Sequence, residues 1–207
     1  MMSISVGIDV DGVLADLNSA VCQLVNGRYG LQLTKADITH WNAVTQLTGM
    51  SGNQYTRLMD EVWRNWQSVQ PEEPGIPSLL KQLHRRGMVV VIITKRSQAS
   101  IGDVVAWLAY QRIGYDELAV IRDRHKLEYP IDILVDDSPK AAERAGAFAP
   151  RRMLLRSQPW NANLPVLPGN VLRVATLCQA VCRVVDEWSV GACYSNSQPT
   201  SSSSSSS

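Results

Sequence analysis

The chain has 207 residues, a length that suits one domain with an insertion better than two independent domains. It carries 20 lysine and arginine residues against 19 aspartate and glutamate residues, so no overall field favours a nucleic-acid polymer or an anionic membrane as partner. Signal-peptide patterns and apolar stretches of about 18 residues are absent, and the four cysteines lack the spacing of a disulfide scaffold, so we expect a reduced, cytoplasmic protein.

The first predicted element is a buried strand over residues 4–10, where β-branched side chains are frequent. Asp9 and Asp11 point to the same side because strand side chains alternate, and Gly12 completes the turn. Two converging carboxylates are costly unless a cation lies between them, and Mg²⁺ prefers oxygen ligands. Taken alone, this stretch is explained equally well by a surface turn with two solvated aspartates.

The next part of the chain has a different character. An apolar face predicts a helix over Ala15–Tyr29. Residues 30–70 are polar and rich in tryptophan, with a further helix expected over Gly52–Val69. The proline- and glycine-rich segment 71–77 is a predicted hinge. We therefore expect residues 16–73 to form a small helical cap inserted after the first strand.

After this segment, apolar runs alternate with amphipathic helices. Strands are predicted over residues 88–94, 118–121, 131–135 and 153–155, and helices over 78–86, 99–113, 139–145 and 174–188. This alternation predicts an α/β fold, a three-layer Rossmann-like parallel sheet with helices on both faces, built from residues 1–15 and 74–192. Residues 193–207, which end in a run of serines, are predicted to be a disordered tail.

Polar residues follow three of the predicted strands. Asp9 and Asp11 follow the first, Thr94 ends the strand from Met88, and Asp136-Asp137 follows the strand from Ile131. Ligands of parallel α/β sheets bind outside the carboxyl ends of the strands, so these residues predict one site. Each member also has a structural explanation: Thr94 as a helix N-cap, Lys126 as a solvated lysine, and Asp136-Asp137-Ser138-Pro139 as a capped helix start.

In this order, Asp9-Val-Asp11-Gly-Val, Thr94, a lysine and Asp136-Asp137 resemble the four motifs of the haloacid dehalogenase-like phosphatases. The run Asp-Val-Asp-Gly-Val-Leu-Ala-Asp and the tryptophan-bearing insertion are similar to the 5′(3′)-deoxyribonucleotidase branch, and most similar to its bacterial or phage members. Trp107, Asp-Ile-Leu-Val-Asp-Asp-Ser-Pro and Gln158-Pro159-Trp160-Asn161 support the same resemblance. The likeness covers roughly residues 4–190.

The resemblance implies a role for each motif. Asp9 would be the nucleophile that forms an aspartyl-phosphate, and Asp11 would carry protons to the leaving group and from water. Thr94 and Lys126 would bind phosphoryl oxygens, with donors near Gly12 and at Lys95. Mg²⁺ would be held by Asp9, Asp11, Asp136 and Asp137, with the direct ligand of the last pair left open. Because Lys95 and Arg96 directly follow Thr94, either can share the role of Lys126.

The implied function is hydrolysis of (deoxy)nucleoside monophosphates, with Trp41 and Trp63 as surfaces for stacking of the base. The alternatives are a phosphatase of another small ester, such as a sugar phosphate, and a non-catalytic phosphate-binding relative. A receiver domain is excluded because it needs a phospho-accepting aspartate in a further α/β stretch, and after Asp137 only Asp186 remains, in the predicted terminal helix. The segment Arg156-Ser157-Gln158 lacks the acidic residue often found before Pro-Trp-Asn in relatives. A homodimer is compatible with the sequence, which carries no signal for an oligomeric state.

Overall fold

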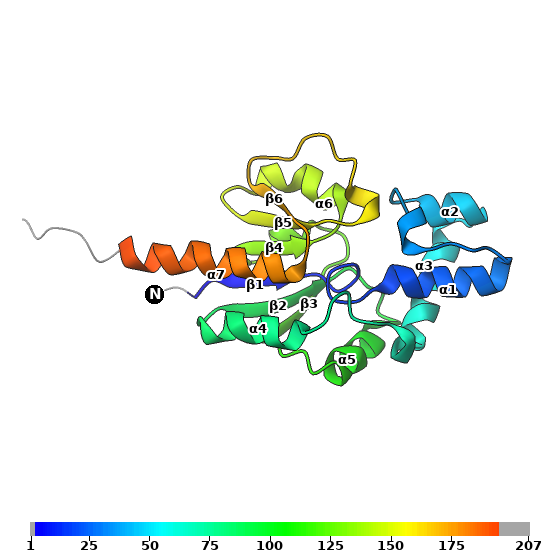
Figure 1. Ribbon diagram of the computed structural model, residues 1–207, viewed down its shortest axis with the longest axis horizontal. Coiled ribbons are helices and arrows are strands. Elements are labelled where there is room, and N and C mark those ends of the chain that lie inside the picture. Colours follow the sequence, from blue (N-terminus) through cyan, green and yellow to red (C-terminus); the bar gives the residue numbers. More distant parts are fainter. Residues whose placement is uncertain (1–2, 195–207) are drawn as a thin grey trace, which may run out of the picture.

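The computed structural model describes residues 3–194, with side chains as far as Glu187, so the serine-rich segment 195–207 lies outside the described residues. Within them the chain forms a six-stranded, fully parallel sheet with the order β3-β2-β1-β4-β5-β6 (Figure 1). The strands are β1 Ser5–Ile8, β2 Val89–Thr94, β3 Glu117–Val120, β4 Ile133–Asp136, β5 Arg152–Arg156 and β6 Val171–Val174.

Helices connect the strands and cover both faces of the sheet. The α-helices are α1 Leu17–Tyr29, α2 Ala43–Thr48, α3 Gly52–Arg64, α4 Ile76–Arg85, α5 Ile101–Tyr110, α6 Pro139–Arg144 and α7 Leu177–Tyr194. Short 3₁₀ segments are η1 Lys35–Asp37, η2 Trp66–Ser68, η3 Lys126–Glu128, η4 Ala145–Phe148 and η5 Pro159–Asn161. α7 therefore continues past the predicted core boundary at residue 192.

The sheet has two apolar faces because strand side chains alternate. Val90 and Ile92 of β2 pack in one core with the apolar sides of α4, α5 and α7, whereas Val91 and Ile93 pack in a second core with η3, α6 and η4. Burial on both faces explains why β2 reads as a continuous apolar run. The predicted three-layer parallel α/β fold is confirmed.

The segment between β1 and α4 forms a helical insertion, which contains α1, η1, α2, α3 and η2 and extends beyond the sheet (Figure 1). Its entry and exit are paired, because Asp16 N donates to the Gln70 carbonyl and Glu72 N donates to the Leu14 carbonyl, each at 2.8 Å. The predicted hinge, residues 71–77, therefore begins with backbone that is hydrogen-bonded to the segment after β1. That the insertion caps a bound substrate stays a prediction.

Several element boundaries differ from the prediction. The helix expected over Gly52–Val69 ends at Arg64, where Asn65 leaves helical geometry before η2. The edge strand β6 was not predicted, because Arg173 interrupts its apolar residues and the sequence pattern placed the start of a helix at Val174. α2 was not predicted either, since its six residues are too few to show a helical period.

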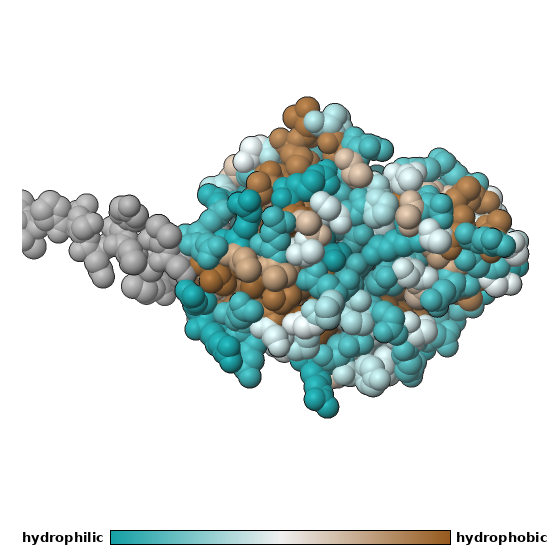
Figure 2. Space-filling view, in the orientation of Figure 1, coloured by the Kyte–Doolittle hydropathy of each residue, from teal (hydrophilic) through white to brown (hydrophobic). Residues whose placement is uncertain are grey.

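The face drawn in Figure 2 is mostly hydrophilic, with separate hydrophobic areas over α7, over the insertion and over the loop before β6, where Val166 is 79% exposed. A single chain does not test whether the protein forms a homodimer, so the homodimer stays a hypothesis. None of the helices within residues 3–194 combines the length and the apolar character needed to cross a bilayer.

Candidate active site

The carboxyl ends of β1 and β4 meet at the centre of the sheet. From β1 the chain builds β2 and β3 on one side, and then returns to add β4 on the other, so the strand order changes direction here. Asp9 directly follows β1, and its N–H donates to the Val135 carbonyl at 2.9 Å. Asp136 ends β4. Both carboxylates therefore lie at the position where parallel sheets bind ligands.

Lys126 lies between these two carboxylates. Its Nζ is 2.7 Å from Asp9 Oδ1 and 2.8 Å from Asp136 Oδ2, and its side chain is almost fully buried. Burial disfavours the ammonium form, but the charges of Asp136 and Asp9 outweigh it and raise the pKa of Lys126. The basic segment that contains this lysine is therefore not a solvated surface loop, and Lys126 is a fixed positive charge inside the site.

His125 holds Lys126 in place. Its Nδ1 accepts a hydrogen bond from Leu127 N at 3.0 Å, its Nε2 lies 3.0 Å from the Ala141 carbonyl, and its ring stacks on Phe148. Desolvation lowers the pKa of the imidazole, in agreement with a neutral ring that accepts at one nitrogen and donates at the other. No role for His125 could be predicted from the sequence, because its contact with Ala141 exists only once the fold brings α6 next to it.

Asp9, Asp136 and Asp137 form a buried carboxylate cluster, in which one oxygen from each lies within 4.8 Å of the others. Burial, together with Asp136 and Asp11, raises the pKa of Asp9 to about 7 against the opposing effect of Lys126. Burial, again with Asp136 and Asp9, raises the pKa of Asp137 well above its usual range. Asp136 Oδ2 is paired with Lys126 Nζ at 2.8 Å, and no other described residue donates a hydrogen bond to it. Three crowded carboxylates carry more negative charge than one lysine can balance, so the cluster fits a divalent metal ion.

Asp11 lies beside this cluster and is bound through both oxygens. Trp63 Nε1 of α3 donates to Asp11 Oδ1 at 3.2 Å, and Arg96 Nε lies 2.7 Å from Asp11 Oδ2. The side chain of Asp11 does not belong to the group of three that can hold a metal ion. The metal and proton-transfer roles expected for Asp11 therefore stay predictions, and of its atoms the backbone carbonyl is the one left for a metal ion.

Gly12 fixes the turn that carries Asp11. Its φ of +74° is in the left-handed region, which favours glycine. Its carbonyl accepts hydrogen bonds from Arg156 Nη1 at 3.1 Å and from Gln158 Nε2 at 2.7 Å. The side chain of Arg156 is also 2.9 Å from Glu72, at the exit of the insertion. The segment Arg156-Ser157-Gln158, whose role the sequence left open, thus anchors the Asp11 turn.

Thr94 and Lys95 follow β2 at the same edge of the sheet. Thr94 is fully buried, and its Oγ1 accepts a hydrogen bond from Arg96 N at 3.3 Å. Lys95 is exposed and lines the cavity described below. The fold therefore brings Lys95 to the cavity, whereas Thr94 lies at the same edge of the sheet without lining the cavity. Lys126 contacts the carboxylates and Lys95 does not.

A cavity of about 320 Å³ opens over the carboxylates. The insertion provides an apolar wall from Leu17, Ile38, Trp41, Tyr55 and Met59, and α6 and the loop after β2 provide a basic wall from Lys95, Arg96, Lys140 and Arg144. Trp41 is 46% exposed in this wall, as its predicted contact with a base requires. Trp63 is 0% exposed and does not line the cavity, so it is not placed to stack on a base.

Two residues that contact the carboxylates were not among the predicted site residues. Trp160 Nε1 donates to Asp137 Oδ2 at 3.0 Å, and Arg96 is paired with Asp11. The signal for Trp160 was present in the Gln158-Pro159-Trp160-Asn161 motif, but the sequence did not show which atom its indole meets. Arg96 was expected only to share the phosphate-binding role of Lys126, since the direction of a side chain in a loop cannot be read from residue order.

Comparison with known proteins agrees with this geometry. A family model described as 5′ nucleotidase, deoxy (Pyrimidine), cytosolic type C protein matches residues 2–167. The chain is 25% identical over 183 residues, 84% of this chain and 90% of the relative, to the Bacillus subtilis (strain 168) protein named "Putative nucleotidase YqfW". It is 23% identical over 150 residues, 67% and 71% of the two chains, to the "Putative 5'(3')-deoxyribonucleotidase" of Chlorobaculum tepidum.

Solved structures share the fold. A HAD-superfamily hydrolase, subfamily IA, variant 1, from Geobacter sulfurreducens PCA superposes with a TM-score of 0.57 at 16% identity, covering 88% of this chain and 96% of that one. At this identity the likeness supports the architecture alone, so the chemistry rests on the family match and on the site residues.

Proposed function

The chain belongs to the family described as 5′ nucleotidase, deoxy (pyrimidine), cytosolic type C protein, and on that premise we propose that it hydrolyses (deoxy)nucleoside monophosphates with Mg²⁺ and an aspartyl-phosphate on Asp9. That it is a hydrolase of the phosphatase and nucleotidase class follows from the family. The observation that carries the finer proposal is the buried cluster of Asp9, Asp136 and Asp137 around Lys126, beneath a cavity with an aromatic wall. A small-molecule substrate and a cytoplasmic location belong to the same proposal.

Asp9, Asp136 and Asp137, with the Asp11 carbonyl, would hold Mg²⁺, which supplies positive charge that offsets the repulsion between the carboxylates and a phosphate dianion. Lys126 adds a positive charge next to the nucleophile Asp9. The charge is fixed in place because Nζ is paired with both Asp9 and Asp136. Thr94, fully buried at the end of β2, offers a hydroxyl donor for a phosphoryl oxygen.

The reaction then proceeds in two displacements. A carboxylate oxygen of Asp9 attacks phosphorus, the bond from phosphorus to the ester oxygen breaks, and Asp11 gives that oxygen a proton. Asp11 next takes a proton from water, which attacks the phosphorus of the aspartyl-phosphate and releases inorganic phosphate. Asp9 returns as a carboxylate and Asp11 returns protonated, so the cycle is balanced. The second aspartate supports phosphoryl transfer rather than carbon–halogen chemistry.

The shape of the cavity supports a nucleoside as the leaving group. Its volume of about 320 Å³ is at the lower end of the range of small-molecule sites. The apolar wall contains Trp41 and Tyr55, on which a base can stack, and one such contact is worth about 1–3 kcal/mol in single-stranded complexes. A sugar phosphate would leave these rings without a partner.

The test is a phosphate-release screen over ribo- and deoxyribonucleoside monophosphates and sugar phosphates, each with Mg²⁺ and with EDTA. We expect metal-dependent release that is fastest with a nucleotide. Release mainly from sugar phosphates would keep the mechanism and remove the nucleotide assignment. A protein that binds phosphate but releases none from any ester, with or without metal, would be the non-catalytic relative and would end the proposal.

A further inference from the structure

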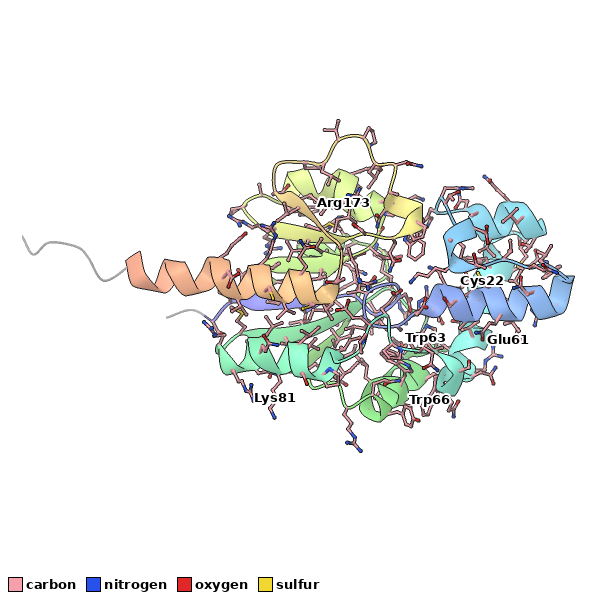
Figure 3. All side chains as sticks on the ribbon, in the orientation of Figure 1. Cys22, Glu61, Trp63, Trp66, Lys81 and Arg173 are labelled. Atoms are coloured by element: carbon pink, nitrogen blue, oxygen red, sulfur yellow. The ribbon has the colours of Figure 1, made fainter. Side chains whose placement is uncertain are left out.

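Trp63 occupies an unusual position for a residue of the insertion. It belongs to α3, which begins at the capping residue Ser51 and presents Leu58, Met59, Val62 and Trp63 as its buried residues. Figure 3 shows Trp63 where the insertion meets the sheet, whereas Trp66 lies farther from that junction. The indole of Trp63 is fully enclosed, and its edge packs at 85° against the ring of Trp107, with the centroids 6.0 Å apart.

The one polar atom of this buried ring is directed at Asp11. Trp63 Nε1 donates to Asp11 Oδ1, while Arg96 Nε lies 2.7 Å from Asp11 Oδ2 without the alignment of a hydrogen bond. The two contacts come from different parts of the fold, because α3 belongs to the insertion and Arg96 to the loop after β2. With each oxygen held by a different element, the carboxylate can neither rotate nor withdraw without losing one contact.

The same two elements are tied together next to Asp11. Ser97 Oγ, beside Arg96, donates to Asp60 Oδ1 at 2.7 Å, and Asp60 lies on α3 one turn before Trp63. Trp107, which packs on Trp63, donates through its own indole to the Val69 carbonyl at 2.8 Å. The position of the Trp63 indole is therefore set by its complete burial and by its contact with the anchored Trp107 ring, so the ring is a rigid donor.

We infer that Trp63 is a positioning residue for Asp11, so the insertion acts on the proton-transfer step as well as on the substrate. The inference rests on the proposed function, in which Asp11 carries the proton. Trp63 does not touch the substrate, because it does not line the cavity. Its N–H sets the direction of the Asp11 carboxyl, and the ester oxygen receives its proton only if that direction is correct.

The test compares two esters whose leaving groups differ in their need for a proton. A nucleoside monophosphate expels an alkoxide and depends on Asp11 as an acid, whereas p-nitrophenyl phosphate expels a stable phenolate. For Trp63→Phe, which keeps an aromatic ring but removes the donor, we expect kcat/KM to fall about tenfold or more for the nucleotide and less than about threefold for p-nitrophenyl phosphate. The ratio within one preparation cancels any loss of folded protein.

Trp66→Phe is the matched control, because Trp66 lies three residues away on the same side of the fold and contacts Tyr110 instead. It should leave the ratio unchanged. Arg96→Gln tests the other contact and should shift the ratio in the same direction even if Trp63→Phe does not fold. In an Asp11→Asn background, Trp63→Phe should have no further effect on the ratio.

An independent measurement follows the indole N–H of Trp63 by NMR, assigned through Trp63→Phe. Asp11→Asn should shift this resonance and leave that of Trp66 in place. Equal losses for both esters in Trp63→Phe and Arg96→Gln would overturn the inference, as would an unmoved Trp63 resonance. Absence of phosphate release from the unsubstituted enzyme would instead contradict the proposed function, so the two failures are distinguishable.

Discussion

Gly12 and Asp137 approach each other so closely that a Cβ at position 12 would lie 2.1 Å from Asp137 Oδ2. The indole of Trp160 stands only 3.1 Å from the same point. This close approach brings the turn after β1 against the carboxylates at the end of β4. The site therefore requires glycine at position 12, because any Cβ there would occupy the space of Asp137.

We predict that Gly12→Ala lowers the free energy of unfolding by about 2 kcal/mol or more and reduces activity at least about tenfold, because strain at positive φ adds to the contact with Asp137. Gly87→Ala is the control: its φ is +72°, but nothing lies within 4 Å of its Cβ position. Chemical denaturation and initial rates measure both. Equal effects of the two substitutions would show that the contact with Asp137 is unimportant.

Asp9→Asn should abolish turnover, by at least about a thousandfold, because an amide cannot form the acyl-phosphate. The fold should remain, since the neutral amide relieves repulsion from Asp136 and Asp11. Asp186→Asn, on the exposed part of α7, is the control and should keep the full rate. Steady-state kinetics and circular dichroism check both. Turnover by Asp9→Asn above the background of an enzyme-free sample would assign the nucleophile elsewhere.

Metal binding should become stronger as the pH rises. Burial raises the pKa of Asp9 from 3.8 to about 7, so the folded protein holds more protons than the unfolded chain between these values. This contribution to stability is present at low pH and is lost as the pH rises through about 7. Mg²⁺ needs the ionised carboxylates, so it restores stability in the same window.

The rise in Tm caused by Mg²⁺ relative to EDTA should therefore be larger near about pH 8 than near about pH 5.5. In free energy of unfolding, the stabilisation is about 2.7 kcal/mol when Mg²⁺ is 100 times its Kd. Asp137→Asn should lose most of this gain. Differential scanning fluorimetry in matched buffers measures it. A stabilisation that is equal at both pH values would contradict the assignment of Asp9 as a ligand.

Substitution of Lys126 and of Lys95, the two candidates for the phosphate-binding lysine, should have clearly different effects on stability and on kcat. Lys126→Ala leaves Asp9 and Asp136 buried without their cation, and we expect a loss of about 3 kcal/mol in metal-free protein and at least about a hundredfold in kcat. Lys95→Ala, on an exposed side chain, should change stability by no more than about 0.5 kcal/mol and kcat by a few-fold. If Lys95→Ala alone reduces kcat, Lys126 is not the phosphate lysine.

Much of this fold can be predicted from sequence because its central strands are buried on both faces and read as continuous apolar runs, as in β2. The prediction fails at the edge of the sheet. In β6 only Val171 and Val174 are buried, so four residues give no period that separates a strand from the first turn of a helix.

The site could be predicted as a set of residues but not as a set of contacts. Asp9, Asp136 and Asp137 are predictable because strand ends share one edge of a parallel sheet. The role of Trp63 is not predictable in this way, because a buried tryptophan and a base-stacking tryptophan have the same spacing on a helix. Only the packed structure, in which Trp63 of α3 meets Trp107, shows that the indole N–H of Trp63 faces Asp11.

The position of β1 also has a consequence for the order in which the protein assembles during synthesis. β1 is made first, but its partners begin at Val89 on one side and at Ile133 on the other. Such distant pairing makes folding slow relative to a helical bundle of equal size. The proposed metal ligands span the same distance, from Asp9 to Asp137, so a nascent chain would gain no stability from the ion until β4 has left the ribosome. Until then, the strand that leads to the proposed nucleophile remains without its full set of neighbours.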